Sequence, residues 1–288
     1  MIIIGCSKSR ELAKSIAKKL KVKYSELLVN KFPDGEFHIR YMTDIKNEII
    51  VLVQTLHEPN ESTLELLFAA YTAKDLGAKK IIAVCPYLAY MRQDKRFNSG
   101  EAVNSKYMGQ LFKIFDTLIT IDPHLHRYKN LNEAYPIKCI KLSANLLIED
   151  FIAKNYNNPI IIGPDDESYQ WASSIANKIH ASAAVMHKNR FTSNKVRVHL
   201  NEEIDMNKRD VIIIDDIIST GHTIFEAIKT IKKDKPKSIN IIAIHGVFAD
   251  KKIYDDIKDN TKSIVTTNTI QNKHSDINVA DLIANALK

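Results

Sequence analysis

The stretch Val211-Ile-Ile-Ile-Asp215-Asp216-Ile-Ile-Ser219-Thr220-Gly221-His222-Thr223 decides the fold, and a helical pattern of apolar residues follows it to about Ile231. A buried strand here delivers two carboxylates at its C-terminal end, where open α/β sheets place ligands. The small and hydroxylic residues after the strand lie at the beginning of a helix. Their backbone N–H groups and hydroxyls, together with the helix dipole, can therefore hold a phosphate. Because the acids suit ribose hydroxyls, the stretch predicts a ribose-phosphate site. A capped helix after a strand is the alternative.

Short apolar runs rich in isoleucine and valine alternate with segments of helical period along the rest of the chain. This alternation is typical of parallel strands that crossover helices bury on both faces. We therefore predict an α/β fold with right-handed crossovers. Strands are expected near residues 2–5, 49–53, 81–85, 118–121, 159–163, 211–214, 239–244 and 263–266.

The chain also repeats itself. Ile2-Ile3-Ile4-Gly5 recurs as Ile160-Ile161-Ile162-Gly163, and Ile81-Ile82-Ala83 recurs as Ile241-Ile242-Ala243, at offsets of 158 and 160 residues. We infer two equivalent α/β domains, 1–142 and 143–288, each with a mainly parallel sheet flanked by helices. The turn of the first half that corresponds to the phosphate loop, residues 54–62, has no glycine and no acid pair. Only the second domain is therefore expected to hold this phosphate.

Composition excludes several classes of protein. The 288 residues are 45% hydrophobic, which excludes disorder, and no apolar run approaches the roughly 20 residues that cross a bilayer. Three isolated cysteines fit a reducing interior rather than a disulfide framework, so we expect a cytoplasmic protein. The formal charge of +7 is compatible with nucleic acid, an acidic membrane surface or small phosphorylated molecules, and does not choose among them.

Four further stretches place polar side chains at turns or strand ends, and each has a structural alternative. Phe32-Pro33-Asp34-Gly35-Glu36 is a proline turn in its own right. Residues 86–96 are rich in cations that suit a polyphosphate, although a surface charge run looks the same. Asp122-Pro123-His124-Leu125-His126 ends a strand, where His-x-His is often structural. Lys188-Asn189-Arg190 follows a short strand predicted at 183–187, and by itself is an ordinary basic turn.

The phosphate loop resembles the fingerprint of the type I phosphoribosyltransferases. Together with the order and spacing of the four other stretches and of Gly163-Pro164-Asp165, it makes the chain similar to the ribose-phosphate pyrophosphokinase family over nearly its whole length. The resemblance implies two tandem phosphoribosyltransferase-like domains and Mg²⁺ as the cofactor. It implies transfer of the β,γ-diphosphoryl group of ATP to the 1-hydroxyl of ribose 5-phosphate, with release of AMP. It also implies a homo-oligomer built from dimers.

The resemblance assigns roles to individual residues. The catalytic pair would be Lys188 and Arg190, on a loop that closes onto the β-phosphorus and stabilises its charge. ATP would be bound by Phe32, Asp34, Glu36, Arg92 and Gln93, with the first three supplied by the neighbouring subunit. Ribose 5-phosphate would be bound by Asp215, Asp216, Ser219, Thr220, Gly221, His222 and Thr223. The Mg²⁺ ligands would be His124 and Asp165.

The chain departs from the family pattern at two places. His222 stands where the common loop has a second glycine, so a histidine must adopt that backbone or accept strain. Asp166-Glu167-Ser168 replaces the usual paired glycines after Asp165. Three rival functions are a phosphoribosyltransferase acting on a base, a non-enzymatic regulatory relative, and a nucleic-acid-binding regulator. The sequence has neither a helix-turn-helix segment nor a basic stripe interleaved with aromatic residues, so it does not favour the nucleic-acid-binding regulator. Neither nucleic acid nor a membrane is an expected partner.

Overall fold

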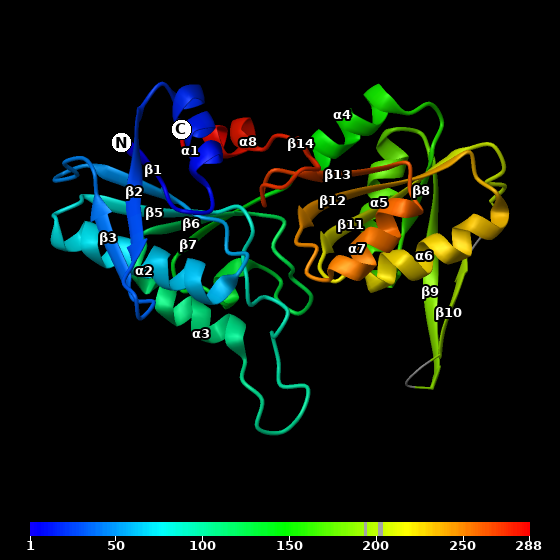
Figure 1. Cartoon of the computed structure of the whole chain (residues 1–288), viewed down its shortest axis with the longest axis horizontal. Helices are drawn as coiled ribbons and strands as arrows, with labels where there is room; N and C mark the ends of the chain where they lie inside the picture. The colour runs from blue at the N-terminus through cyan, green and yellow to red at the C-terminus, as the bar shows by residue number, and fades with distance from the viewer. Residues whose placement is uncertain (193–194, 201–203) are drawn as a thin grey trace. The chain divides into compact units, whose positions relative to one another are not determined.

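A computed structural model describes residues 1–192, 195–200 and 204–288 of the chain (Figure 1). The chain divides into two compact units. Unit 1 comprises Met1–Ser143, Thr269–Gln271 and Val279–Lys288, and unit 2 comprises Ala144–Asn268 and Asn272–Asn278. Each unit is built on one sheet, and the two sheets have the same strand order. The predicted α/β class is confirmed.

Unit 1 contains a mostly parallel sheet of order β3-β2-β1-β4-β5-β6-β7, in which only the β2–β3 pair is antiparallel. Its strands are β1 (Ile2–Gly5), β2 (Lys23–Lys31), β3 (Phe37–Tyr41), β4 (Ile49–Val53), β5 (Lys80–Cys85), β6 (Thr117–Ile121) and β7 (Lys138–Leu142). Its helices are α1 (Arg10–Leu20), α2 (Pro59–Asp75), α3 (Asn104–Leu111) and α8 (Ala280–Ala286), with short 3₁₀ turns at Phe112–Ile114 and Leu131–Glu133.

Unit 2 repeats this arrangement with the order β10-β9-β8-β11-β12-β13-β14, and among its described strands only β9 and β10 pair in antiparallel fashion. Its strands are β8 (Ile160–Gly163), β9 (Ser182–Thr192), β10 (Lys195–Leu200), β11 (Asp210–Ile218), β12 (Ser238–Gly246), β13 (Ser263–Thr267) and β14 (Ser275–Ile277). Its helices are α4 (Asn145–Asn155), α5 (Asp166–Lys178), α6 (His222–Ile231) and α7 (Lys251–Asp259), with a 3₁₀ turn at Lys232–Asp234.

The central strands are apolar along their whole length because both faces of each sheet are covered. β4 and β8 are almost entirely buried, as is the Val211 to Ile214 part of β11. In unit 1 the chain leaves the central β1–β4 pair in opposite directions, and right-handed crossovers then place α1 and α2 on opposite faces, as Figure 1 shows. The unbroken Ile/Val runs of the sequence are therefore the signature of a sheet without a solvent-facing side.

Tertiary pairing lengthens two strands beyond their predicted ends. β11 reaches Ile218 because β12 pairs with it from Asp210↔Ser238 to Ile218↔Gly246. β9 reaches Thr192 because it forms an antiparallel ladder with β10. The predictions of strands ending at 214 and at 187 were too short, since a partner strand supplies hydrogen bonds to residues whose own side chains carry no strand signal.

The last helix does not belong to the unit that precedes it in the chain. α8 packs against α1 and β7 of unit 1, while α4 packs against α5 and β14 of unit 2. Each helix thus covers the same position on one of the two sheets. The predicted division into 1–142 and 143–288 as separate domains stays a prediction, and the packing of α8 assigns the C-terminal segment to unit 1.

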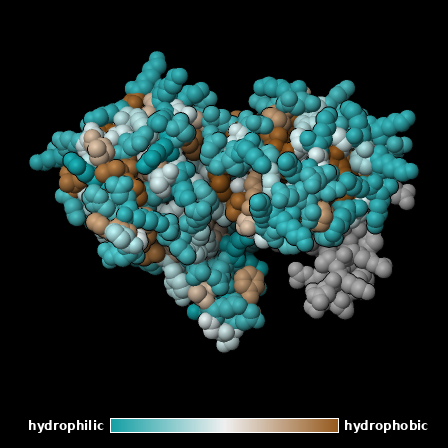
Figure 2. Space-filling model, in the orientation of Figure 1, coloured by the Kyte–Doolittle hydropathy of each residue, from teal (hydrophilic) through white to brown (hydrophobic). Residues whose placement is uncertain are grey.

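The surface is mainly hydrophilic in the view of Figure 2, with hydrophobic side chains in small separate areas. Phe32, Phe68 and Tyr71 of unit 1 are among the exposed aromatic residues. Among the residues that the structure describes, none of the helices combines the length and the apolar character needed to span a bilayer.

Candidate active site

Three carboxylates gather at the C-terminal end of the unit 2 sheet. Asp215 and Asp216 lie within β11, and Asp165 follows the neighbouring parallel strand β8. Loss of solvent raises the pKa of Asp215 well above its ordinary value, and the charges of Asp216 and Asp165 raise it further. Ionisation of Asp215 is therefore unfavourable without a partner, as expected of a site that receives hydroxyl donors or a cation.

Asp165 has a structural task as well. It is the N-cap of α5, where its Oδ1 accepts hydrogen bonds from the Ser168 backbone N at 3.0 Å and from Ser168 Oγ at 2.9 Å. Ser168 Oγ in turn accepts from the Asp165 backbone N at 3.1 Å, which completes a capping box. The serine that replaces a glycine of the family pattern thus fixes the orientation of the Asp165 carboxylate.

The phosphate loop turns through Gly221, which has φ of 88° and is the N-cap of α6. A Cβ at this position would lie 2.7 Å from Ile257 Cδ1 and 3.2 Å from Ile253 Cγ2, so glycine is required both by the backbone and by the packing of α7. The loop is held from the other side by backbone bonds from Val247 N to Ile218 O at 2.9 Å and from Ala249 N to Ser219 O at 2.8 Å. The first turn of α6 is thereby presented on a fixed support.

His222 needs no unusual backbone. It is the first residue of α6 and does not have a positive φ, because Gly221 alone takes the left-handed conformation in this turn. The expected strain at the second-glycine position is therefore absent. The exposed imidazole lies with Nε2 3.9 Å from Oδ2 of Asp250, the N-cap of α7. Ser219 and Thr223, which flank the turn, both interact with other groups of the protein.

The predicted catalytic residues lie on the β9–β10 hairpin of unit 2. Lys188 and Arg190 are in β9 rather than in a turn after it, and their backbones pair with Val198 and Val196 of β10. Their side chains lie outside the part of the structure that is described. The loop that was predicted to carry them is thus the arm of an antiparallel hairpin at the edge of the sheet.

The predicted adenine-binding residues lie on the corresponding hairpin of unit 1. Phe32 N donates to Glu36 O at 2.8 Å and Gly35, with φ of 94°, closes the β2–β3 turn. Asp34 Oδ1 accepts from the Glu36 backbone N at 3.1 Å, so this carboxylate shapes the turn. Phe32 is 52% exposed, with its ring 5.8 Å from that of His38. An aromatic face at a rigid, exposed turn can stack on a planar ligand.

Arg92 and Gln93 lie in the long loop between β5 and α3, where Arg92 is exposed and Gln93 is half-buried. Gln93 Oε1 accepts from Asn104 Nδ2 at 2.6 Å, and Gln93 O accepts from Ser105 N at 3.3 Å. These bonds tie the loop to the start of α3. Tyr90, in the same loop, has φ of 63°, a conformation that costs a non-glycine residue about 1–3 kcal/mol and is common at functional sites.

Sequence reasoning missed two residues beside this loop. Asp94 has a side chain only 1% exposed, and its Oδ1 lies 2.7 Å from Nη1 of Arg127. Arg127 belongs to the loop after β6, which also carries His124. The sequence offers one signal for the pair, a lone acid placed among the cations of residues 92–96, but nothing in it indicates that the acid is buried.

His124 is half-buried and its ring lies against that of His126, with centroids 3.9 Å apart and planes at 81°. Asp122, two residues before it, has φ of 36°, and its backbone N donates to Leu142 O at 2.9 Å. His126, predicted to be structural, is thus the neighbour that packs on the predicted metal ligand.

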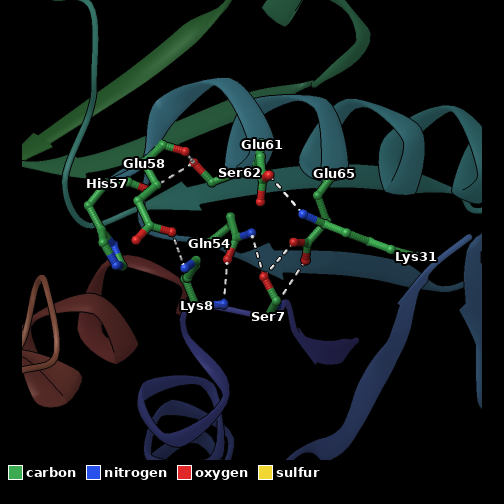
Figure 3. A network of polar contacts seen from close by, with 9 residues as sticks. All are labelled: Ser7, Lys8, Lys31, Gln54, His57, Glu58, Glu61, Ser62 and Glu65. Carbon is green, nitrogen blue, oxygen red and sulfur yellow. Dashed lines mark hydrogen bonds and ion pairs between the residues drawn. The ribbon is translucent and has the colours of Figure 1, made fainter. Parts of the chain in front are cut away.

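Polar side chains that follow β1 and β4 of unit 1 are hydrogen-bonded to one another and to the first turns of α2 (Figure 3). Glu65 of α2, which is 2% exposed, accepts from Ser7 N at 2.8 Å and from Ser7 Oγ at 2.5 Å. Gln54 Oε1 accepts from Lys8 N at 3.0 Å, and Lys8 Nζ is paired with Glu58. An internal carboxylate of α2 therefore takes up the donors that follow β1.

The donor set suits Mg²⁺. This ion prefers oxygen ligands, takes only one or two protein carboxylates and keeps several waters. Asp165, whose charge contributes to the raised pKa of Asp215, supplies a carboxylate of this kind. Within the described part of the chain, no group of three or more His, Cys, Asp or Glu side chains is arranged to hold a metal ion, and Mg²⁺ bound together with substrate oxygens needs no such group.

Replacement of Asp215 by asparagine is expected to stabilise the fold at neutral pH. A raised folded-state pKa means that ionisation costs the native protein stability as pH rises above the unfolded value of about 3.9. The amide of the Asp215→Asn variant removes that cost, and its oxygen still accepts the Asp216 backbone N–H, which lies 3.0 Å from Oδ1 in the native protein. We expect a higher melting temperature at pH 7 in metal-free buffer, and equal melting temperatures near pH 4.

Asp210, on the same strand, provides a control of opposite sign. Burial opposes its ionisation, but hydrogen bonds from Ser238 at 2.6 Å and Lys237 at 2.9 Å lower the pKa of Asp210 overall. Asp210→Asn is therefore expected to lower the melting temperature at pH 7, with the difference shrinking as pH falls through the native pKa. A loss of stability in both variants at pH 7 would contradict the assignment of Asp215.

The two sheets have the same strand order, and in unit 2 an acid pair, a glycine turn and a helix N-terminus lie at the C-terminal end of the strands. These features define a protein of the phosphoribosyltransferase type. A family model described as a phosphoribosyl transferase domain matches residues 128–281. A second, described as the N-terminal domain of ribose phosphate pyrophosphokinase, matches residues 1–115. The chain belongs to the ribose-phosphate pyrophosphokinase family.

Relatives support this along the full length. The ribose-phosphate pyrophosphokinase of Methanothermobacter thermautotrophicus is 33% identical over 289 residues, with 100% of both chains covered. That of Saccharolobus solfataricus is 35% identical over 291 residues, covering 98% of this chain and 97% of the relative. The crystal structure of phosphoribosylpyrophosphate synthetase from Mycobacterium smegmatis has the same fold, with a TM-score of 0.86 at 24% identity, covering 99% and 97% of the two chains. The protein is therefore an enzyme of this family.

Proposed function

We propose that this enzyme transfers the β,γ-diphosphoryl group of ATP to the 1-hydroxyl of ribose 5-phosphate, giving 5-phosphoribosyl 1-diphosphate and AMP for nucleotide biosynthesis. The proposal rests mainly on one observation in unit 2. The acid cluster of Asp165, Asp215 and Asp216 and the Gly221 turn lie together at the C-terminal end of the sheet. The same edge of unit 1 has no such turn, so the two units have different tasks.

Ribose 5-phosphate is bound by its two ends. Ser219 to Thr223 hold the 5-phosphate with backbone N–H groups, hydroxyls and the N-terminus of α6. Asp215 and Asp216 accept hydrogen bonds from the 2- and 3-hydroxyls, and these donors offset the loss of solvent and the neighbouring charges that raise the pKa of Asp215. Because both ends of the sugar are held, its 1-hydroxyl is aligned for attack, and alignment of this kind supplies a large part of a rate enhancement.

In this proposal ATP is bound by residues of unit 1, and the catalytic pair comes from the β9–β10 hairpin. Phe32 stacks on adenine while Asp34 and Glu36 bind its edge, and Arg92 and Gln93 bind the triphosphate. Lys188 and Arg190 stabilise the charge that develops on the transferring group. In this proposal the exposed Phe32 turn serves the site of a neighbouring subunit, so the active enzyme is a homo-oligomer built from dimers.

Mg²⁺ would be held by His124 and by Oδ2 of Asp165, the oxygen that takes no part in the α5 cap described above. When bound, it neutralises charge on the polyphosphate and fixes its geometry. The capping box determines how the Asp165 carboxylate is directed, and no chemistry beyond binding and orientation is required of it.

The test is incubation of the purified protein with ribose 5-phosphate, Mg²⁺ and γ-labelled ATP. The proposal requires AMP and a labelled diphosphorylated sugar in equal amounts. ADP with a monophosphorylated sugar, or turnover that does not depend on ribose 5-phosphate, would refute it. Solution mass measured with and without dilution tests the dimer unit, since a monomer that retains full activity would exclude a shared adenine site.

A further inference from the structure

The loop between β5 and α3, residues 86–103, is braced from within at its outer end. Glu101 accepts from the Phe97 backbone N at 2.8 Å, from the Asn98 backbone N at 3.1 Å and from Asn98 Nδ2 at 2.6 Å. Arg96 Nε donates to the Glu101 backbone O at 2.9 Å. These hydrogen bonds hold the outer part of the loop together. The orientation of the loop is therefore set by the contacts that residues 93–97 make with other segments.

Arg127 is the anchor that comes from another loop. Its Nη1 donates to Oδ1 of Asp94 at 2.7 Å, and its guanidinium carbon lies 5.4 Å from the centre of the Phe97 ring. Arg127 thus contacts the 86–103 loop at two points, the buried carboxylate of Asp94 and the exposed ring of Phe97. Tyr128, the next residue, is hydrogen-bonded to Ser105 Oγ at 2.7 Å, and Ser105 bonds Gln93 O.

Loss of one partner of this ion pair would cost more than at the surface, because the other partner is buried. The Asp94 side chain is 1% exposed, whereas that of Arg127 is 45% exposed, so the carboxylate has lost its water and depends on the arginine. Asp94 Oδ2 is also buried and has no hydrogen-bond partner within the described structure. Removal of Arg127 would leave an uncompensated buried charge directly beside Arg92 and Gln93.

We propose that Arg127 is a positioning residue, which fixes Arg92 and Gln93 through Asp94 and Phe97 and so joins the triphosphate-binding loop to the His124 loop. The proposal rests on the proposed function, because it takes Arg92 and Gln93 as ATP ligands. Arg127 itself need not touch the nucleotide. Its planar group can bond a carboxylate and stack on a ring at the same time, which a lysine cannot do equally well.

The test compares variants in ATP titrations at saturating ribose 5-phosphate. Arg127→Met is expected to raise the KM for ATP by about 10-fold to 10²-fold, the scale on which misplacement of binding groups acts, with a smaller change in kcat and an unchanged KM for ribose 5-phosphate. Arg127→Lys is expected to recover part of the affinity. Direct titration of the resting protein with MgATP, without ribose 5-phosphate, should show the same loss in Kd.

The double variant Arg127→Met with Asp94→Asn separates positioning from stability. It removes both charges, so the melting temperature is expected to recover while the KM for ATP stays raised. Lys178→Met is the matched control, since Lys178 pairs at 3.1 Å with Glu149, whose side chain is 8% exposed, in unit 2. It should lower the melting temperature without altering the KM for ATP.

The outcomes are distinct. A wild-type protein without ATP-dependent turnover of ribose 5-phosphate refutes the proposed function. If the wild type turns over, two results overturn the positioning role alone. One is an unchanged KM for ATP in Arg127→Met, and the other is a KM that returns to normal together with the melting temperature in the double variant.

Discussion

Replacement of Lys188 by alanine is expected to lower kcat by about 10²–10³, which is the usual cost of removing one preorganised group that stabilises transition-state charge. Lys188 lies in β9, on the edge hairpin of unit 2. Since the proposed role of this lysine begins only when the diphosphoryl group is in transfer, the KM for ribose 5-phosphate should change by less than about 3-fold. Steady-state kinetics with each substrate varied in turn measures both quantities.

Lys195→Ala is the matched control, because Lys195 lies on β10 of the same hairpin and carries the same charge. It should leave kcat within about 2-fold of the wild type if the effect depends on position rather than on the total charge of the hairpin. Equal losses in kcat and in ribose 5-phosphate affinity for Lys188→Ala would instead make this lysine a substrate-binding group.

Replacement of Gly221 by alanine should abolish ribose 5-phosphate binding and destabilise unit 2. The left-handed backbone costs an L-residue about 1–2 kcal/mol, and forcing a Cβ into a packed contact costs about 1–3 kcal/mol more. The contact is severe, since the Cβ would lie 2.7 Å from Ile257 Cδ1. Relief of either strain moves the turn that presents the N–H groups of α6. The measurements are the melting temperature and the Kd for ribose 5-phosphate.

Gly77→Ala separates the two costs. Gly77 also has a left-handed backbone, with φ of 80°, but the nearest atom to an added Cβ is Lys46 Cγ at 3.6 Å, an ordinary contact. This control therefore bears only the backbone cost and should leave ribose 5-phosphate binding intact. Ile257→Val in the Gly221→Ala background is expected to restore part of the stability by shortening the side chain that the Cβ meets. No difference between the two glycine variants would argue against a packing role for α7.

The succession of strand, glycine turn and helix at residues 211–231 could be predicted because its signal is local. Gly221, the hydroxylic residues and the acid pair are contiguous, and a buried strand followed by a helical pattern leaves few conformations open to them. His222 shows where local reasoning ends. The sequence leaves open whether the backbone of His222 is strained. In the structure it is not, because α6 begins at this residue.

The hairpins were the least predictable part of the site. The repeat in the sequence matched the isoleucine-rich strands but did not indicate the two hairpins. Residues 32–36 form the turn of the β2–β3 hairpin, whereas residues 188–190 lie in strand β9 of the corresponding β9–β10 hairpin. Edge hairpins have one neighbour and a solvated side, so their residues are not constrained to the apolar pattern of the central strands. Lys188 and Arg190 were therefore placed in a turn, whereas the ladder with β10 extends the strand through them.

By itself, the sequence determined the α/β class, the family and the position of the glycine turn before α6, because periodicity and contiguous motifs are properties of neighbouring residues. Only the tertiary structure decided that Asp94 is buried against Arg127, that Glu65 of α2 accepts hydrogen bonds from Ser7, and that α8 belongs to unit 1. Each of these depends on segments that lie far apart in the chain, and burial and charge at such contacts arise only when the sheets have assembled.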